Sequence, residues 1–66
     1  MGEHVTNKVQ IFRARQGITQ EELAEKVKVS RQTIIAIEKG NYTPSVLLAL
    51  KISRIFKSHV EEIFSL

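Results

Sequence analysis

The sequence contains no cysteine, no tryptophan and only one proline. Without cysteine the chain can form no disulfide and no thiolate metal site, and it has no cysteine nucleophile. Its two histidines, His4 and His59, lie far apart in the sequence with no cysteine near them, so we expect both on the surface rather than in a metal site. The sequence also offers no nucleophile–base pair, no carboxylate dyad suited to a cleft and no phosphate-binding loop. An enzyme is therefore the least expected function, and we expect no cofactor and no metal.

Long hydrophobic runs are absent as well. No apolar stretch approaches the ~20 residues that a membrane-spanning helix needs, and no secretory leader is visible. Together with the lack of cysteine, these absences favour a cytoplasmic protein with no membrane partner.

The 66 residues allow a single domain, which we take as residues 1–66. A hydrophobic core of this size supplies only about 3–5 kcal/mol, so small domains usually need a further source of stability. Because disulfides and metals are excluded, oligomerisation is the remaining source of additional stability. The net charge is +3, and the basic residues of the first forty positions suit a phosphate backbone. Charge alone does not distinguish this reading from an ordinary solvated surface.

Helix start and stop signals divide the chain into five short helices, and no alternating strand pattern is present. Thr19 and Glu22 form a capping box before the second helix, Ser30 precedes the third, Ser45 precedes the fourth, and Gly17 suits the left-handed end of the first. The expected helices cover about residues 7–16, 20–27, 31–40, 46–56 and 60–64.

Residues 20–39 read QEELAEKVKVSRQTIIAIEK, two helical patterns joined by a tight turn. Their apolar positions are Leu23, Ala24, Val27, Ile34 and Ile37. The small side chain of Ala24 allows two crossed helices to approach closely. Such a pair of helices can hold the second one firmly enough for it to enter a DNA groove.

This segment resembles the helix-turn-helix of the phage-repressor/Cro-type transcriptional regulators, the XRE family. The resemblance covers about residues 7–64 and includes Arg13, Gly17, Ile18, Thr19, Gln20, Glu38, Gly40, Pro44 and Ser45. It implies an all-α fold, a compact five-helix lambda-repressor-like DNA-binding domain with the helix-turn-helix at its second and third helices. Lys28 and Lys57 depart from the family, because they stand at turns where glycine is common.

The third helix offers the residues that we expect to read bases. Ile34 and Ile37 set its buried direction, so the opposite side faces outward. The predicted base-reading residues are Arg31, Gln32, Thr33, Ile35 and Ala36. Gln32 is the first choice, because an amide pairs bidentately with adenine, and Arg31, which can reach a guanine or a phosphate, is the second. Alternatively, Ile35 packs against the second helix and Arg31 is a solvated surface charge.

Phosphate contacts are expected at the start of the second helix and around both ends of the third. The predicted phosphate-contacting residues are Gln20, Ser30, Lys39, Asn41, Tyr42 and Thr43. Tyr42 could equally cover the edge of the core. The resemblance further implies that Arg13 and Glu38 form a structural ion pair that fixes the angle of the third helix.

The fourth helix carries more apolar residues than one core face can use. Its expected core face consists of Val46, Ala49, Leu50, Ser53 and Phe56. A second stripe on this helix consists of Leu48, Ile52 and Ile55, and we expect it to be exposed and available to a partner. With the last apolar residues of the chain, this stripe would form a homodimer interface of Leu48, Ile52, Ile55, Phe64 and Leu66. Alternatively, the last helix covers part of the stripe.

These expectations predict a sequence-specific DNA-binding transcriptional regulator. It would act as a repressor, binding a palindromic operator in double-stranded DNA as a homodimer whose two copies read half-sites about 34 Å apart. No small-molecule effector is indicated. One alternative keeps DNA binding but makes the protein an antitoxin whose fourth-helix stripe binds a toxin. Another is a helical protein-interaction module that does not bind DNA.

Overall fold

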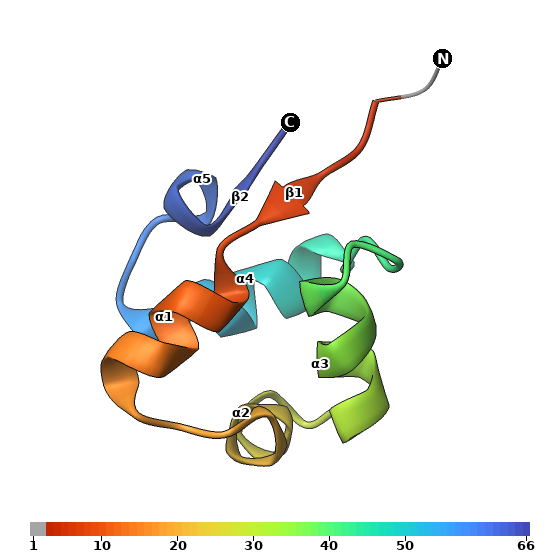
Figure 1. Ribbon diagram of the computed structural model, residues 1–66. Helices are drawn as coiled ribbons and strands as arrows, with labels where there is room; N and C mark the ends of the chain where they lie inside the picture. Colours follow the sequence, from red (N-terminus) through yellow and green to blue (C-terminus); the bar gives the residue numbers. More distant parts are fainter. Residues whose placement is uncertain (1–2) are drawn as a thin grey trace.

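A computed structural model describes residues 3–66 of the chain, within which five helices lie between two short strands. The elements are β1 (Thr6–Asn7), α1 (Val9–Gln16), α2 (Gln20–Val27), α3 (Arg31–Glu38), α4 (Val46–Phe56), α5 (Val60–Ile63) and β2 (Phe64–Ser65). In Figure 1, α1, α2, α3 and α4 surround a common centre, while α5 and the two strands lie together at one end. The predicted five-helix fold is confirmed, whereas the paired strands were not predicted.

Local capping fixes the boundaries of the helix-turn-helix. Thr19 Oγ1 accepts a hydrogen bond from the backbone N–H of Glu22 (3.0 Å), and Glu22 Oε1 accepts one from the backbone N–H of Thr19 (2.8 Å). Ser30 Oγ accepts from the backbone N–H of Thr33 (3.3 Å) at the start of α3. These bonds satisfy amide groups that have no partner inside the helix. The predicted capping box and the predicted start of α3 are therefore confirmed.

Two lysines hold the left-handed backbone conformation that glycine usually adopts. Lys28, between α2 and α3, has φ 62°, and Lys57, between α4 and α5, has φ 53°. Such a conformation brings the Cβ atom close to the following carbonyl oxygen and costs about 1 kcal/mol or more for a residue other than glycine. The turn between α2 and α3 consequently carries some strain.

The core lies where α2 packs against α3 and α4. Ala24 is 3% exposed at the contact between α2 and α3, where its small side chain permits the close approach that the sequence predicts. The fully buried side chains are Val9, Leu23, Val27, Ile34, Ile37, Ile52 and Ile63. Each contributes roughly 1.5–3 kcal/mol relative to an exposed position, which is large for a domain of this length.

The predicted orientation of α4 is correct in part: Ala49, Ser53 and Phe56 are buried as expected, at 9%, 7% and 5% exposed. Leu48 and Ile52, expected on an exposed stripe, belong to the core with exposed fractions of 7% and 0%. Val46 and Leu50, expected in the core, are 77% and 52% exposed. Both sides of α4 are apolar, so the helical period alone does not identify the inward side. That side is selected by α1, α2 and α5, which pack against α4.

The two strands, which the sequence did not predict, join the ends of the described chain. β1 and β2 are antiparallel, with Thr6 opposite Ser65 and Asn7 opposite Phe64. The backbone N–H of Lys8 then donates to the carbonyl oxygen of Ile63 (2.8 Å). As a result α1 begins two residues later than expected, and α5 ends one residue earlier.

Candidate nucleic-acid interface

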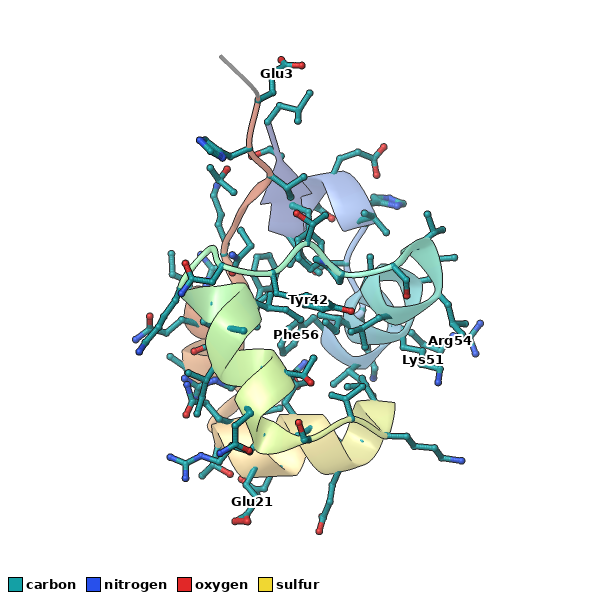
Figure 2. All side chains as sticks on the ribbon, turned by 90° about the vertical axis from the view of Figure 1, so that its right-hand side faces the viewer. Glu3, Glu21, Tyr42, Lys51, Arg54 and Phe56 are labelled. Carbon is teal, nitrogen blue, oxygen red and sulfur yellow. The ribbon has the colours of Figure 1, made fainter. Side chains whose placement is uncertain are left out.

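All five predicted base-reading residues lie outside the set of buried core residues. Arg31 and Gln32 are exposed, while Thr33, Ile35 and Ala36 are half-buried. Ile35 is not among the partly buried hydrophobic residues that pack against the core. In Figure 2, α3 lies at the front of the molecule, and Glu21 marks the adjoining start of α2. The side of α3 opposite Ile34 and Ile37 is thus an accessible surface, as the helical geometry predicts.

α3 is held in place by an ion pair between its last residue and α1. Arg13 Nε donates to Glu38 Oε2 (2.8 Å), and a second nitrogen, Nη2, donates to Glu38 Oε1 (3.3 Å). The two side chains are only 16% and 6% exposed. Arg13 Nη1 also donates to the carbonyl oxygen of Ile18 (3.0 Å), before α2. The predicted ion pair is present, and it connects three segments of the domain.

Gln20 adds α2 to this network. Its Nε2 atom donates to Glu38 Oε1 (3.0 Å), so the amide is partly occupied by a contact within the protein. Gln20 and Arg31 also line one open hollow of about 500 Å³ between the starts of α2 and α3. The structure therefore places a predicted phosphate-contacting residue beside a predicted base-reading residue.

The remaining predicted phosphate-contacting residues fall into two groups. The Ser30 hydroxyl caps α3 and is also hydrogen-bonded to the hydroxyl of Thr33 (3.1 Å), which limits what it can offer to a ligand. An exposed group follows α3 and consists of Lys39, Asn41, Tyr42 and Thr43. These side chains extend the accessible surface of α3 toward α4.

The five residues predicted to form a homodimer interface do not form one surface. Leu48 and Ile52 are in the core, Phe64 is 8% exposed, and Ile55 is half-buried against the core. Only Leu66, which is 80% exposed, is freely accessible. A side chain within the core cannot contact a second molecule without unfolding, so this set of residues is rejected as an interface.

The exposed apolar surface of α4 is instead formed by Val46, Leu47 and Leu50, which we call the α4 patch. Their exposed fractions are 77%, 65% and 52%. The sequence analysis does not predict Leu47 in this surface. Its spacing from Leu50, Lys51 and Arg54 puts it on the same side of the helix as two charged residues, which is a signal of exposure. Figure 2 shows Lys51 and Arg54 projecting together from α4 on the side away from α3.

Within residues 3–66, no group of three or more histidine, cysteine, aspartate or glutamate side chains is arranged to hold a metal ion. None of the helices in this part of the chain combines the length and apolarity needed to traverse a bilayer.

A helix-turn-helix family model matches residues 9–63. The chain is 53% identical over 57 residues to an uncharacterized HTH-type transcriptional regulator of Archaeoglobus fulgidus, a match that covers 86% of this chain and 81% of that protein. A protein of the same description from Bacillus subtilis is 57% identical over 58 residues, which is 88% of each chain.

Two solved structures are similar to this chain in fold. The clp gene regulator ClgR from Corynebacterium glutamicum is 30% identical with a TM-score of 0.76, over 82% of this chain and 57% of that one. The restriction-modification controller protein C.AhdI from Aeromonas hydrophila, at 24% identity and a TM-score of 0.76 over 82% of each chain, shares the fold. With almost the whole chain matched and the geometry of α2 and α3 as described, this protein belongs to the helix-turn-helix family of transcriptional regulators.

Proposed function

We propose that the protein is a sequence-specific repressor that places α3 in the major groove of a palindromic operator as a homodimer. The observation that carries this proposal is the accessible side of α3, whose other side is fixed to the core and whose last residue is bound to Arg13. A recognition helix must keep its orientation while its side chains meet the edges of the bases. The buried ion pair provides that rigidity.

The chemistry of this surface suits base recognition. Gln32 can pair bidentately with adenine and Arg31 with guanine, while Ile35 and Ala36 can contact apolar groups in the groove. Gln20, Ser30, Lys39, Asn41, Tyr42 and Thr43 are the proposed phosphate contacts, and Lys39 is the cationic one. The net charge of +3 favours approach to DNA.

A homodimer would bring two such surfaces to one face of the duplex. We propose that the α4 patch is its interface, because a two-fold arrangement can bury the same three aliphatic side chains of both copies at once. Burial of this surface would also supplement the small core of each copy. We prefer a second copy to a toxin because each half-site of the proposed palindromic operator would need its own α3.

Repression follows from occupancy of a promoter by the bound dimer. The relatives come from archaea and bacteria, whose DNA lies in the cytoplasm, and we propose the same compartment for this protein.

The direct test is the selection of bound sequences from a random pool of DNA duplexes at two salt concentrations. We expect a palindromic motif and a steep decrease in affinity with salt, because phosphate contacts release counterions. The absence of any enriched motif at both salt concentrations would contradict the proposal and favour a protein-interaction module.

A further inference from the structure

An open hollow of about 720 Å³ lies where α4 meets α5. Its lining extends from Leu50 on α4, through the turn at Lys57, to Glu62 on α5. Arg54 also lines it, and Figure 2 shows this side chain projecting from α4 on the side away from α3. The hollow is therefore separate from the surface that we propose to contact DNA.

The hollow has an excess of positive charge that the protein itself does not neutralise. Arg54 and Lys57 are both exposed. Within residues 3–66 neither cation forms an ion pair, although the carboxylate of Glu62 lines the same hollow. That carboxylate instead accepts a hydrogen bond from the backbone N–H of His59 (2.7 Å) at the start of α5. A guanidinium and an ammonium group are consequently available to an anionic partner.

The backbone at Lys57 is unfavourable for any residue with a side chain. Its φ of 53° lies in the left-handed region, which glycine adopts without strain. A lysine at this position supplies a cation to the hollow and keeps the turn strained. Strained positions cluster at binding sites, where the side chain has a use that outweighs the local cost.

The rest of the lining is apolar or already engaged. Leu50 is 52% exposed at the edge of the hollow and adjoins the α4 patch, to which it also belongs. The hydroxyls of Ser53 and Ser58 donate to the carbonyl oxygens of Leu50 (2.9 Å) and Phe56 (3.1 Å). The features open to a ligand are thus two cations beside an aliphatic surface. A nucleic acid would use the cations but not the aliphatic surface, whereas a protein segment with acidic and apolar side chains matches both.

We propose that the hollow between α4 and α5 docks an acidic segment of another protein, with its carboxylates at Arg54 and Lys57 and an apolar side chain on Leu50. Because Leu50 is shared with the α4 patch, the docked segment competes with the second copy for this residue. The competition rests on the proposed function, which places the second copy there, but the docking does not.

The test begins with peptides and uses the full chain without DNA. A library of random peptides displayed on phage is selected against the protein, and the Kd of the labelled consensus peptide is measured by fluorescence anisotropy. We expect a consensus that combines aspartate or glutamate with a large apolar residue. Replacement of its acidic residues by the corresponding amides should weaken binding about tenfold, because the charge complementarity is lost. A consensus without acidic residues, or no enrichment, would overturn the inference.

Variants of the protein locate the binding in the hollow. Arg54→Glu should weaken binding of the peptide roughly tenfold, because attraction becomes repulsion. Lys26→Glu is the matched control, since it changes the net charge equally at an exposed position of α2, and it should bind like the wild type. Equal weakening by both variants would indicate non-specific attraction and overturn the inference. So would an effect of Arg54→Glu on a non-specific DNA duplex but not on the peptide.

Lys57→Gly separates binding from folding. It removes a cation and relaxes the backbone, so the peptide should bind several-fold more weakly while the melting temperature does not fall. Unchanged binding to both Lys57→Gly and Arg54→Glu would contradict the docking site.

Sedimentation with and without saturating peptide tests the competition. We expect the peptide to convert dimers to monomers and to lower the affinity for the selected operator. A dimer that persists with the peptide bound would overturn the competition for Leu50. A chain that is monomeric without the peptide would instead remove the α4 patch from the proposed function, and the peptide measurements would still decide the docking site.

Discussion

Glu38 accepts hydrogen bonds from both Arg13 and Gln20, so that one carboxylate at the end of α3 is bound to α1 and to the start of α2. The bond from Arg13 Nε measures 2.8 Å, and that from Gln20 Nε2 measures 3.0 Å. Because the two partners belong to α1 and α2 and the carboxylate belongs to α3, this junction couples the stability of the domain to the orientation of the accessible side of α3.

Loss of this carboxylate should destabilise the whole domain. Glu38→Ala would leave Arg13, whose side chain is 16% exposed, without its partner, at a cost of about 3–5 kcal/mol. That cost is comparable with the total stability of many small domains. We expect urea denaturation to show a large fall in the free energy of unfolding. Glu38→Gln, which keeps an acceptor oxygen, should lose less. A Glu38→Ala protein that unfolds like the wild type would show that the ion pair is dispensable.

A glycine at the left-handed position of Lys28, unlike the loss of Glu38, should not lower the stability of the domain. Lys28→Gly removes the steric cost at φ 62°, although glycine also gains entropy in the unfolded chain. We expect the melting temperature to stay the same or to rise slightly. Lys28→Ala, the control, removes the charge but keeps the strain and should not raise it. A clear fall in melting temperature for Lys28→Gly would indicate that the lysine side chain makes a stabilising contact.

The α4 patch predicts a charge-sensitive dimer. Leu47→Glu would place two carboxylates in the proposed interface, so sedimentation should show monomers and the affinity for the operator should fall. Ile11→Glu is a matched control, because Ile11 is also a half-exposed aliphatic residue, at 49%, but belongs to α1. We expect it to leave the dimer intact. If Leu47→Glu sediments as the wild-type dimer does, another surface must form the interface.

Base recognition by Gln32 should be separable from stability. Its side chain is exposed, so Gln32→Ala should melt like the wild type. Loss of a bidentate pair with adenine should weaken binding to the selected operator by roughly 1–3 kcal/mol and relax the preference at that base pair. Lys26→Ala, a change at another exposed residue, in α2, should preserve that preference. Unchanged base selectivity in Gln32→Ala would remove this residue from the readout.

Local signals in the sequence were sufficient for much of this architecture. The capping box of Thr19 and Glu22 and the start of α3 after Ser30 depend on hydrogen bonds between neighbours in the chain, so short patterns reveal them. The ion pair of Arg13 was found through the family resemblance, because nothing in a local pattern links α1 to the end of α3.

Features that depend on contacts between segments far apart in the sequence could not be predicted from short sequence patterns. The choice between the two apolar sides of α4 depends on how α1, α2 and α5 pack against it, which the helical period does not encode. β1 and β2 comprise two residues each, too few to produce a recognisable alternation. The hollow between α4 and α5 depends on how the two helices meet in space, which no short pattern specifies.

The pairing of β1 with β2 has a consequence for how the protein is made. Lys8 finds its backbone partner at Ile63, while the side chain of Asn7 donates to the carbonyl oxygen of Ile37 (2.8 Å). During translation, the segment that begins α1 must therefore wait for nearly the whole of the rest of the described chain to leave the ribosome. The pairing of the two strands can form only after synthesis has passed Ile63, so the start of α1 acquires its last backbone contacts at the end of synthesis.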